Sequence, residues 1–313
     1  MCTAVSCRNY FGRNLDVEKS YGECVVITPR NYKLSMRTLP APDSHYAMIG
    51  MAAVAEDYPL YFEATNEMGL SMAGLNFLHN ADYKEYDAAK ENVTPFEFIP
   101  YVLGRCKDVN EAEKLLVNIN IVKLNFSEEL PLSPLHWIIS DKDKSITVES
   151  VKDGLKIYEN PFGVLTNNPT FDYHLMNINN YMQLHEGFAE SRLSAERKFN
   201  NYSLGMGALG LPGDYSSASR FVRAVFIKEK SPSFESEKEA VSHFFHMLGG
   251  VAMPKGCVMT KDGRSEYTRY SSCCNADKGI YYYTTYDNST VTAIDMHSVN
   301  LDGEKLYTFQ ISE

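Results

Sequence analysis

Short apolar runs dominate the first 75 residues and predict β-strands. Three of them, ECVVITPRN (23–31), YAMIGMAAVA (46–55) and GLSMAGLNF (69–77), are bounded by glycine, proline or charged residues. Runs of this length with such boundaries are typical of strands. We therefore expect the chain to open with a sheet.

The pattern then changes to one that predicts a pair of helices. The stretch TPFEFIPYVLGRC begins with Thr94 as N-cap, Pro95 at the first helical position and Glu97 as the capping-box acid. In DVNEAEKLLVNI, Asp108 and Glu111 stand in the same relation. Both stretches thus carry the start signals of a helix.

The second half of the chain repeats this alternation. We expect strands at LHWIISD and SITVESV, and helices at 216–229 and 235–249. The remainder, from residue 266 onward, is rich in stretches typical of strands, joined by short turns. The order strands, helices, strands, helices, strands is that of an α+β chain with largely antiparallel sheets. No linker or internal repeat divides it, so we expect one domain spanning residues 1–313, with two stacked sheets covered by helices.

Charge and hydropathy narrow the classes of partner. The chain has 30 Lys plus Arg and 40 Asp plus Glu, a formal charge of −10. A chain this acidic gains no counterion release on a phosphate backbone, so we expect no nucleic-acid partner. The sequence shows no signal-peptide pattern and no apolar run approaching about 20 residues, so we expect no membrane partner and a cytoplasmic location.

The seven cysteines are an odd number, which favours reduced thiols in such a compartment. The adjacent pair Cys273 and Cys274 could form a strained disulfide. We favour two free thiols in a strand, one on each face.

Two common motifs for phosphate and metal binding are missing from the sequence. It contains no P-loop and no H-E-x-x-H stretch. His243 and His246 lie one helical turn apart, but no acids or cysteines near them complete a metal site, and we interpret them as one helix face. His136 and His174 are interpreted as structural. We therefore expect neither a metal nor an organic cofactor.

The opening stretch MCTAVSC offers a nucleophile. Removal of Met1 would leave Cys2 with a thiol and an α-amine on the same Cα. An ordinary thiol has a pKa of about 8.5, and an α-amine, at roughly 7.7–8.0, is partly neutral at pH 7. The amine can therefore serve as the base that activates the thiol, without a histidine. The ordinary alternative is a strand that happens to begin with cysteine.

The stretch YFGRNLD follows closely and supports the first interpretation. Arg13 and Asp16 come just after a glycine turn, and a hairpin with residues 3–6 would bring both near Cys2. Arg13 could then stabilise the thiolate, and Asp16 could hold the amine. A surface ion pair at a hairpin is the alternative.

Taken together, nine stretches resemble the choloylglycine hydrolases, a family of bile salt hydrolases and penicillin V acylases with an N-terminal nucleophile. They are MCTA, YFGRNLD, YGECVVITPRNYK, DYPLYFEATNEMGLSMAGLNF, NVTPFEFIPYVLG, LPLSPLHW, GVLTNNPTFDYH, GLPGDYSSASRFVRA and YSSCCNADKGIYYYTTYDN. They cover nearly the whole chain in the family's order, and the bile salt hydrolases resemble it most. The resemblance implies an αββα sandwich, two largely antiparallel sheets between helical layers, which matches the predicted order of elements.

The resemblance also implies a catalytic set. Its members are Cys2 after removal of Met1, Arg13 and Asp16 in GRNLD, Asn76 in AGLNF, Asn167 in LTNNP and Arg220 in SASRF. Asn76 and Asn167 would supply N–H donors to an oxyanion, which suits amide chemistry. Arg220 would add a second cation near the thiolate. We expect Asp214 and the following serines to cap the helix that contains Arg220. In that helix, we expect Arg223 to occupy a solvated position.

The implied activity is hydrolysis of a conjugated bile salt to a free bile acid plus glycine or taurine, through a thioester on Cys2. A steroid requires an apolar pocket, for which we expect Leu15 and the loop YPLYF, with Tyr58, Leu60 and Phe62, as walls beside Asn76. The family suggests a homotetramer. Alternatives are a penicillin V acylase or another N-acyl amidase on the same residues and, from another class, a non-catalytic protein that binds steroids or acyl chains.

Overall fold

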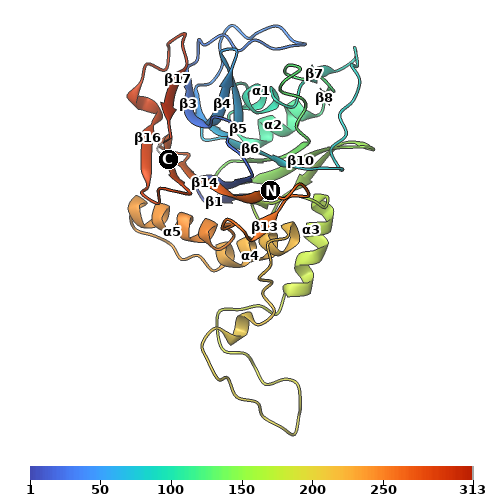
Figure 1. The fold of residues 1–313 in the computed structure, drawn as a ribbon, viewed down its shortest axis with the longest axis vertical. Helices are drawn as coiled ribbons and strands as arrows, with labels where there is room; N and C mark the ends of the chain where they lie inside the picture. Colours follow the sequence, from blue (N-terminus) through green and yellow to red (C-terminus); the bar gives the residue numbers. More distant parts are fainter. Residues whose placement is uncertain (312–313) are drawn as a thin grey trace.

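Two antiparallel sheets, stacked face to face with helices on both outer faces, form the body of the molecule (Figure 1). The structure, a computed structural model, describes residues 1–311. This architecture confirms the predicted αββα sandwich.

The first sheet carries the N-terminus. Its strand order is β12-β1-β2-β14-β15-β16, with β13 beside β14. Its strands are β1 (Cys2–Cys7), β2 (Tyr10–Val17), β12 (Val164–Leu165), β13 (Val258–Met259), β14 (Ser265–Asn275), β15 (Ile280–Thr285) and β16 (Thr292–Asp295). The predicted hairpin is β1-β2, which lies between β12 and β14 in this sheet. The prediction of a glycine turn is wrong, because Arg8 and Asn9 form the turn and Gly12 lies within β2, opposite Val5. Cys273 and Cys274 are free thiols at successive positions of β14 and so point to opposite faces, as expected.

The second sheet has the order β11-β10-β9-β6-β5-β4-β3-β17. Its strands are β3 (Cys24–Thr28), β4 (Met48–Ala55), β5 (Tyr58–Asn66), β6 (Ser71–Asn76), β9 (Leu135–Ser140), β10 (Ser145–Val151), β11 (Gly154–Glu159) and β17 (Tyr307–Gln310), and a separate parallel pair is β7 (Glu91–Val93) and β8 (Ile119–Ile121). The prediction of a loop at YPLYF is wrong, because these residues form the first half of β5. A bulge in β5 places Phe62 out of register with β4, since Tyr61 pairs with Ala52 and Glu63 pairs with Met51.

Helices cover the two outer faces of the sandwich. α1 (Phe98–Leu103) and α2 (Val109–Leu116) lie on the second sheet, and α4 (Ser217–Glu229) and α5 (Glu237–Gly249) lie on the first (Figure 1). The sequence predicted these four, and it missed α3 (Phe171–Asn177), which is too short to show a clear period. The short helices η1, η2 and η3 span Ile178–Tyr181, Met206–Ala208 and Met296–Ser298.

The start of α1 differs from the prediction. The helix begins at Phe98, with Glu97 as N-cap, rather than after Thr94. The Glu97 carboxylate does accept the Thr94 N–H, but it also accepts the N–H of Arg37. The expected bond is therefore used to close a turn that precedes the helix.

The predicted cap of α4 is confirmed, whereas the predicted exposure of Arg223 is wrong. Ser216 caps the helix by accepting the Ser219 N–H, and the Asp214 carboxylate accepts from both serines. Arg223 is buried and donates to the carbonyls of Gly250, Pro212 and Asp214. The end of α5 and the loop before α4 cover the helix at this point, so Arg223 ties them together.

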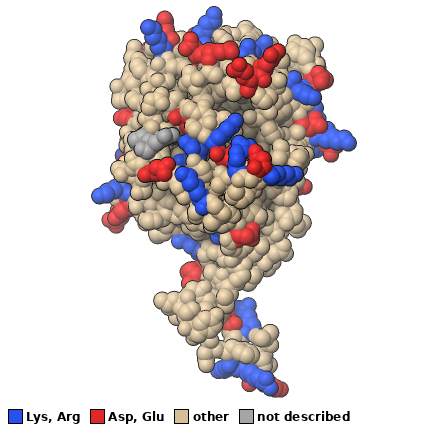
Figure 2. Space-filling view, viewed as in Figure 1, with Lys and Arg blue, Asp and Glu red and all other residues tan. Residues whose placement is uncertain are grey.

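One segment leaves the body of the molecule. Residues 182–212 form a long excursion between α3 and α4 that projects beyond the layers (Figure 1). Over the body, acidic and basic side chains are interspersed on the face shown in Figure 2. Within residues 1–311, no helix is both long enough and apolar enough to cross a membrane.

Candidate active site

The β1-β2 hairpin sets the geometry around Cys2. Its register pairs Cys2 with Leu15 and Ala4 with Arg13. Cys2 and Arg13 are therefore diagonal neighbours on one face of the sheet, within reach of a long side chain. Arg13 and Asp16 are fully buried, so the alternative of a surface ion pair is wrong.

Arg13 crosses from the first sheet to the second. Its Nη1 donates to the carbonyls of Phe62 and Gly74 at 2.9 and 2.7 Å. Its Nη2 is buried and has no hydrogen-bond partner in the described part of the chain. Burial lowers the pKa of Arg13, but anionic neighbours, Cys2 first among them, outweigh burial and make the net shift upward. The guanidinium thus has one seated nitrogen and one unpaired nitrogen.

Asp16 has one carboxylate oxygen paired and one unpaired. The Thr268 hydroxyl donates to Oδ1 at 2.5 Å, whereas Oδ2 is buried without a hydrogen-bond partner among residues 1–311. Burial raises the pKa of this carboxyl, and Arg220 and the N-terminal amine oppose that shift. With Met1 present, the terminal nitrogen donates to the Asp16 carbonyl at 2.6 Å and pairs with Glu266. Burial lowers the pKa of this amine, which favours its neutral form.

Asn167 and Arg220 hold the backbone of Cys2. The Cys2 N–H donates to Asn167 Oδ1 at 2.8 Å, and Arg220 Nη2 donates to the same oxygen at 2.7 Å. Arg220 Nη1 donates to the Cys2 carbonyl at 2.5 Å and to Thr3 Oγ1 at 2.6 Å. Because both groups facing Oδ1 are donors, the orientation of the Asn167 amide is fixed.

The positions of the two asparagines refine the sequence interpretation. Asn167 Nδ2 donates to the Asn76 carbonyl at 2.8 Å, which leaves its second N–H for another acceptor. Asn76 ends β6, and its side chain is exposed. The structure therefore brings the two together through the Asn76 backbone. Asn167 acts first as an acceptor for the Cys2 nitrogen, a role that the sequence did not indicate.

Several residues that support this cluster were missed from the sequence. Thr268 binds Asp16, Ser217 Oγ accepts the Asn167 N–H at 2.8 Å, and His174 Nε2 contacts the Asn167 carbonyl at 3.1 Å. The hydroxyls gave no signal, since Ser and Thr are common in strands and at helix starts. His174 was interpreted as structural, and its buried position agrees with that.

The four pocket residues proposed besides Asn76 divide into two groups. Leu15 is buried directly opposite Cys2, and Phe62 packs against the same core. Tyr58 and Leu60 belong to the other core, beneath α1 and α2. Because the bulge at Phe62 changes which face each side chain takes, the structure does not bring Tyr58 and Leu60 to Cys2.

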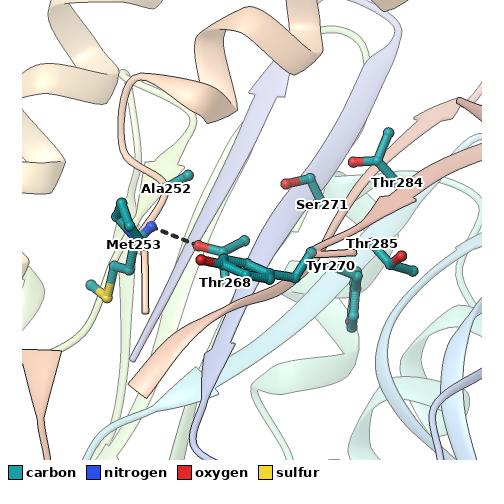
Figure 3. Close-up of a pocket in the computed structure, with 9 residues that line it drawn as sticks. Ala252, Met253, Thr268, Tyr270, Ser271, Thr284 and Thr285 are labelled. Carbon is teal, nitrogen blue, oxygen red and sulfur yellow. Dashed lines mark hydrogen bonds between the residues drawn. The ribbon is translucent and has the colours of Figure 1, made fainter. Parts of the chain in front are cut away.

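A surface cavity of about 330 Å³ opens near the cluster but does not contain Cys2 (Figure 3). It is lined by the 252–254 loop and by residues of β14 and β15. Thr268 is the lining residue that also contacts the cluster: its hydroxyl accepts the Met253 N–H at 2.8 Å and donates to Asp16. The cavity therefore adjoins Asp16 only through Thr268.

Within the part of the chain that the structure describes, no group of three or more His, Cys, Asp or Glu could hold a metal ion. His243 and His246 do not converge on a third ligand, and His243 instead contacts the Ser231 hydroxyl at 2.7 Å. The arrangement around Cys2 comprises a thiol, a terminal nitrogen, two guanidinium groups, a carboxylate and two amides, which is a set suited to nucleophilic attack on a carbonyl.

Comparison with known proteins places this set in a family. Residues 2–309 match the linear amide C–N hydrolases of the choloylglycine hydrolase family. A bile salt hydrolase/transferase from Lactiplantibacillus plantarum is 54% identical over 99% of this chain and 97% of its own length. A mutant of the conjugated bile acid hydrolase from Clostridium perfringens superposes with a TM-score of 0.91 at 37% identity, covering 100% of this chain and 97% of that one. The penicillin V acylase from Agrobacterium tumefaciens shares the fold, with a TM-score of 0.78 at 23% identity, over 99% of this chain and 91% of that one.

Proposed function

The chain belongs to the choloylglycine hydrolase family of linear amide C–N hydrolases, and we propose that it splits the amide bond of conjugated bile salts to give a free bile acid plus glycine or taurine. The observation that carries this proposal is the buried cluster in which Asn167 Oδ1 accepts hydrogen bonds from both the Cys2 nitrogen and Arg220. Relatives named for bile salt hydrolysis align over nearly the whole chain and support the choice of substrate.

The proposed mature chain is a single domain that begins at Cys2. Loss of Met1 converts the Cys2 N–H into an amine with additional donors, one for Asn167 and another for the unpaired Asp16 Oδ2. A buried carboxylate oxygen without a partner is costly, and a free amine beside it removes that cost. Intact-mass measurement of active enzyme tests this step, and retained Met1 would contradict it.

In the proposed mechanism, the α-amine takes the proton of the Cys2 thiol and the thiolate attacks the carbonyl carbon of the amide. The second Asn167 N–H and the exposed Asn76 side chain donate to the oxyanion. The protonated amine then passes its proton to the leaving nitrogen, the C–N bond breaks, and a thioester remains. Water gives a proton to the same amine and attacks the thioester, which releases the acid and restores the thiol.

A panel of substrates tests the proposed function. We expect turnover of glycocholate and taurocholate to exceed that of penicillin V by at least tenfold. Faster turnover of penicillin V would favour an acylase on the same residues. Binding of free bile acid without turnover of any amide would favour a binding protein.

Transfer of the acyl group to an amine is a second candidate activity. Four relatives are named bile salt hydrolase/transferase, and an amine can attack a thioester in place of water. Incubation of glycocholate with excess taurine should then give taurocholate, detected by mass spectrometry. Free cholate as the sole product would exclude this activity.

We further propose a homotetramer in the cytoplasm, assembled through the projecting segment 182–212. This segment exposes large apolar side chains, which are costly to leave in water when gathered on one excursion. The most exposed are Met182, Leu193, Tyr202 and Leu204, each more than 80% accessible. Light scattering after size exclusion tests the tetramer, and cell fractionation tests the location.

A further inference from the structure

Glu63 is a buried carboxylate in the middle of the interface between the two sheets. It lies on β5, just after the bulge at Phe62, and is 1% exposed. The strand around it, YFEATN, is otherwise uncharged. None of the proposed catalytic steps uses it.

Hydroxyl groups of the first sheet saturate this carboxylate. Tyr281 and Ser272 donate to Oε1 at 2.5 and 2.9 Å, and Tyr270 donates to Oε2 at 2.7 Å. A carboxylate that accepts three hydroxyl donors is suited to the ionised state. Burial raises the pKa of Glu63, and Arg13 together with these donors opposes that shift.

The same carboxylate faces the guanidinium of Arg13. Its Oε2 lies 3.8 Å from Arg13 Nη1, and both side chains are almost completely buried. Nη1 itself is held by the carbonyls of Phe62 and Gly74, so direct hydrogen bonds to the backbone set the position of the guanidinium. Glu63 therefore adds a negative charge beside a guanidinium whose position is already fixed by other hydrogen bonds.

A buried ion pair is a poor way to stabilise an interface between sheets. Desolvation of two charges can cancel their attraction, and apolar replacements of similar volume are often neutral or stabilising. A function of the pair in setting the charge near Cys2 gives a physical reason for burying it here. Cys2 is the diagonal neighbour of Arg13 on the same face of the sheet, so a charge placed against Arg13 also changes the electrostatic potential at the Cys2 sulfur.

We propose that Glu63 is a positioning residue that acts through Arg13: its buried negative charge partly neutralises the guanidinium and limits how strongly Arg13 stabilises the Cys2 thiolate. This inference rests on the proposed function for its catalytic meaning. The effect of the Glu63 charge can be measured from the reactivity of the Cys2 thiol alone, without a substrate.

Other titratable and charged groups face either this pair or Cys2. They are the terminal amine of Met1 before β1, Asp16 on β2, Tyr21 after β2, Tyr270 and Cys274 on β14, Tyr281 on β15 and Arg220 on α4. Arg13 and Arg220 favour the thiolate, and Asp16 opposes it in the same way as Glu63.

The test is the pH profile of Cys2 alkylation by iodoacetamide, followed at the N-terminal peptide by mass spectrometry. Glu63→Gln removes the charge and keeps the shape. We expect its alkylation midpoint to move to lower pH by about half a unit or more, because an anion near the thiolate is lost. Glu63→Asp keeps the charge and should stay near the wild-type midpoint.

Glu67→Gln is a matched control from the turn directly after the same strand. Glu67 is a largely buried carboxylate paired with Arg30, and it does not contact Arg13. It should lower thermal stability without moving the alkylation profile. A Glu63→Gln profile that matches wild type, or that moves to higher pH, would overturn the proposal. So would equal shifts for Glu63→Gln and Glu63→Asp.

A second background keeps the test valid if Glu63→Gln alone does not fold. Arg13→Gln should move the midpoint to higher pH. The double variant Arg13→Gln/Glu63→Gln buries no unpaired charge, and it should keep the Arg13→Gln midpoint, because Glu63 acts through Arg13. A double variant whose midpoint lies about half a unit or more below that of Arg13→Gln would overturn the proposal. Failure of wild-type enzyme to cleave glycocholate would instead count against the proposed substrate, because alkylation needs no bile salt.

Discussion

The two faces of the second sheet bury different kinds of side chain. Toward α1 and α2, the core is built from large apolar groups, with Phe98 packed edge-on against Trp137 at 4.8 Å. Toward the first sheet, the same sheet presents the Glu63 carboxylate and receives the Arg13 guanidinium. The first face gains free energy chiefly from apolar burial, whereas the second also buries charges, whose desolvation must be offset by partners.

Strand β5 shows how one stretch of sequence serves both faces. Its early residues, Tyr58 and Leu60, pack in the core beneath the helices. After the bulge at Phe62, Glu63 points into the space between the sheets. Stability and chemistry therefore depend on opposite faces of one sheet. Substitutions on one face should change folding stability, and substitutions on the other should change turnover.

The largest effect should come from Cys2 on the charged side. Cys2→Ser replaces the thiol by a hydroxyl, which ionises far less readily. The α-amine is too weak a base to compensate for this difference. We expect amide turnover to fall by roughly 10³-fold or more, with a melting temperature within a few degrees of wild type. Turnover near that of wild type would place the nucleophile elsewhere.

The matching variant on the apolar side is Phe98→Ala. Phe98 is fully buried, so its truncation leaves a cavity against Trp137. We expect unfolding free energy to fall by about 3–5 kcal/mol, measured by chemical denaturation. Turnover per folded molecule should stay within about twofold of wild type, since α1 does not contact the cluster. A parallel loss of turnover would show that the two sides are coupled.

The hairpin and the element order could be predicted because they depend on local signals. Alternation along β1 and β2 is sufficient to put Arg13 on the same face of the sheet as Cys2, whereas it puts Asp16 on the opposite face. The turn was misplaced, because it lies at Arg8 and Asn9 and not at Gly12. The strand at YPLYF was missed, and Pro59 argues against a strand at this point. Here Pro59 lies in the half of β5 that pairs with β4 alone, because β6 pairs only with residues 63–65, and proline is tolerated at such an edge.

Contacts between distant segments could not be predicted. Nothing in the spacing links Glu63 to Tyr270 or Tyr281, more than 200 positions away. The acceptor role of Asn167 depends on two donors that the fold brings to it, and the burial of Arg223 depends on the end of α5. In each case the decisive partner lies on another element.

The dependence of folding stability on pH should come from the charged side of the sheet. His174 supports Asn167 on the charged side, and its Nδ1 is buried without a hydrogen-bond partner in the described part of the chain. Burial lowers the pKa of His174 to about 4, below the unfolded value near 6.5. Between these values the unfolded state binds more protons, so stability should fall as pH falls, by about 3 kcal/mol in total.

Denaturation at pH 7 and pH 4.5 measures this effect. His174→Gln should reduce the pH dependence, because the group that resists protonation is gone. His246→Gln, at an exposed position of α5, should leave the dependence unchanged. Equal pH dependence in His174→Gln and wild type would assign the acid response to other groups.

The smallest effects should separate two arginines of one helix. Arg220 donates to the Cys2 carbonyl, Thr3 and Asn167 from one planar group. Arg223 instead donates to one backbone carbonyl at the end of α5 and to two in the loop before α4. Lysine keeps the charge but cannot reproduce a planar fork. Arg220→Lys should therefore misplace Cys2 and lower kcat by about 10–100-fold. Arg223→Lys should leave kcat per folded molecule within about twofold and lower unfolding free energy by about 1–3 kcal/mol, because buried carbonyls lose their donors. Kinetics and denaturation on both variants provide the comparison. If Arg223→Lys lowered kcat while Arg220→Lys affected stability alone, the helix would support the site through α5 rather than through Asn167.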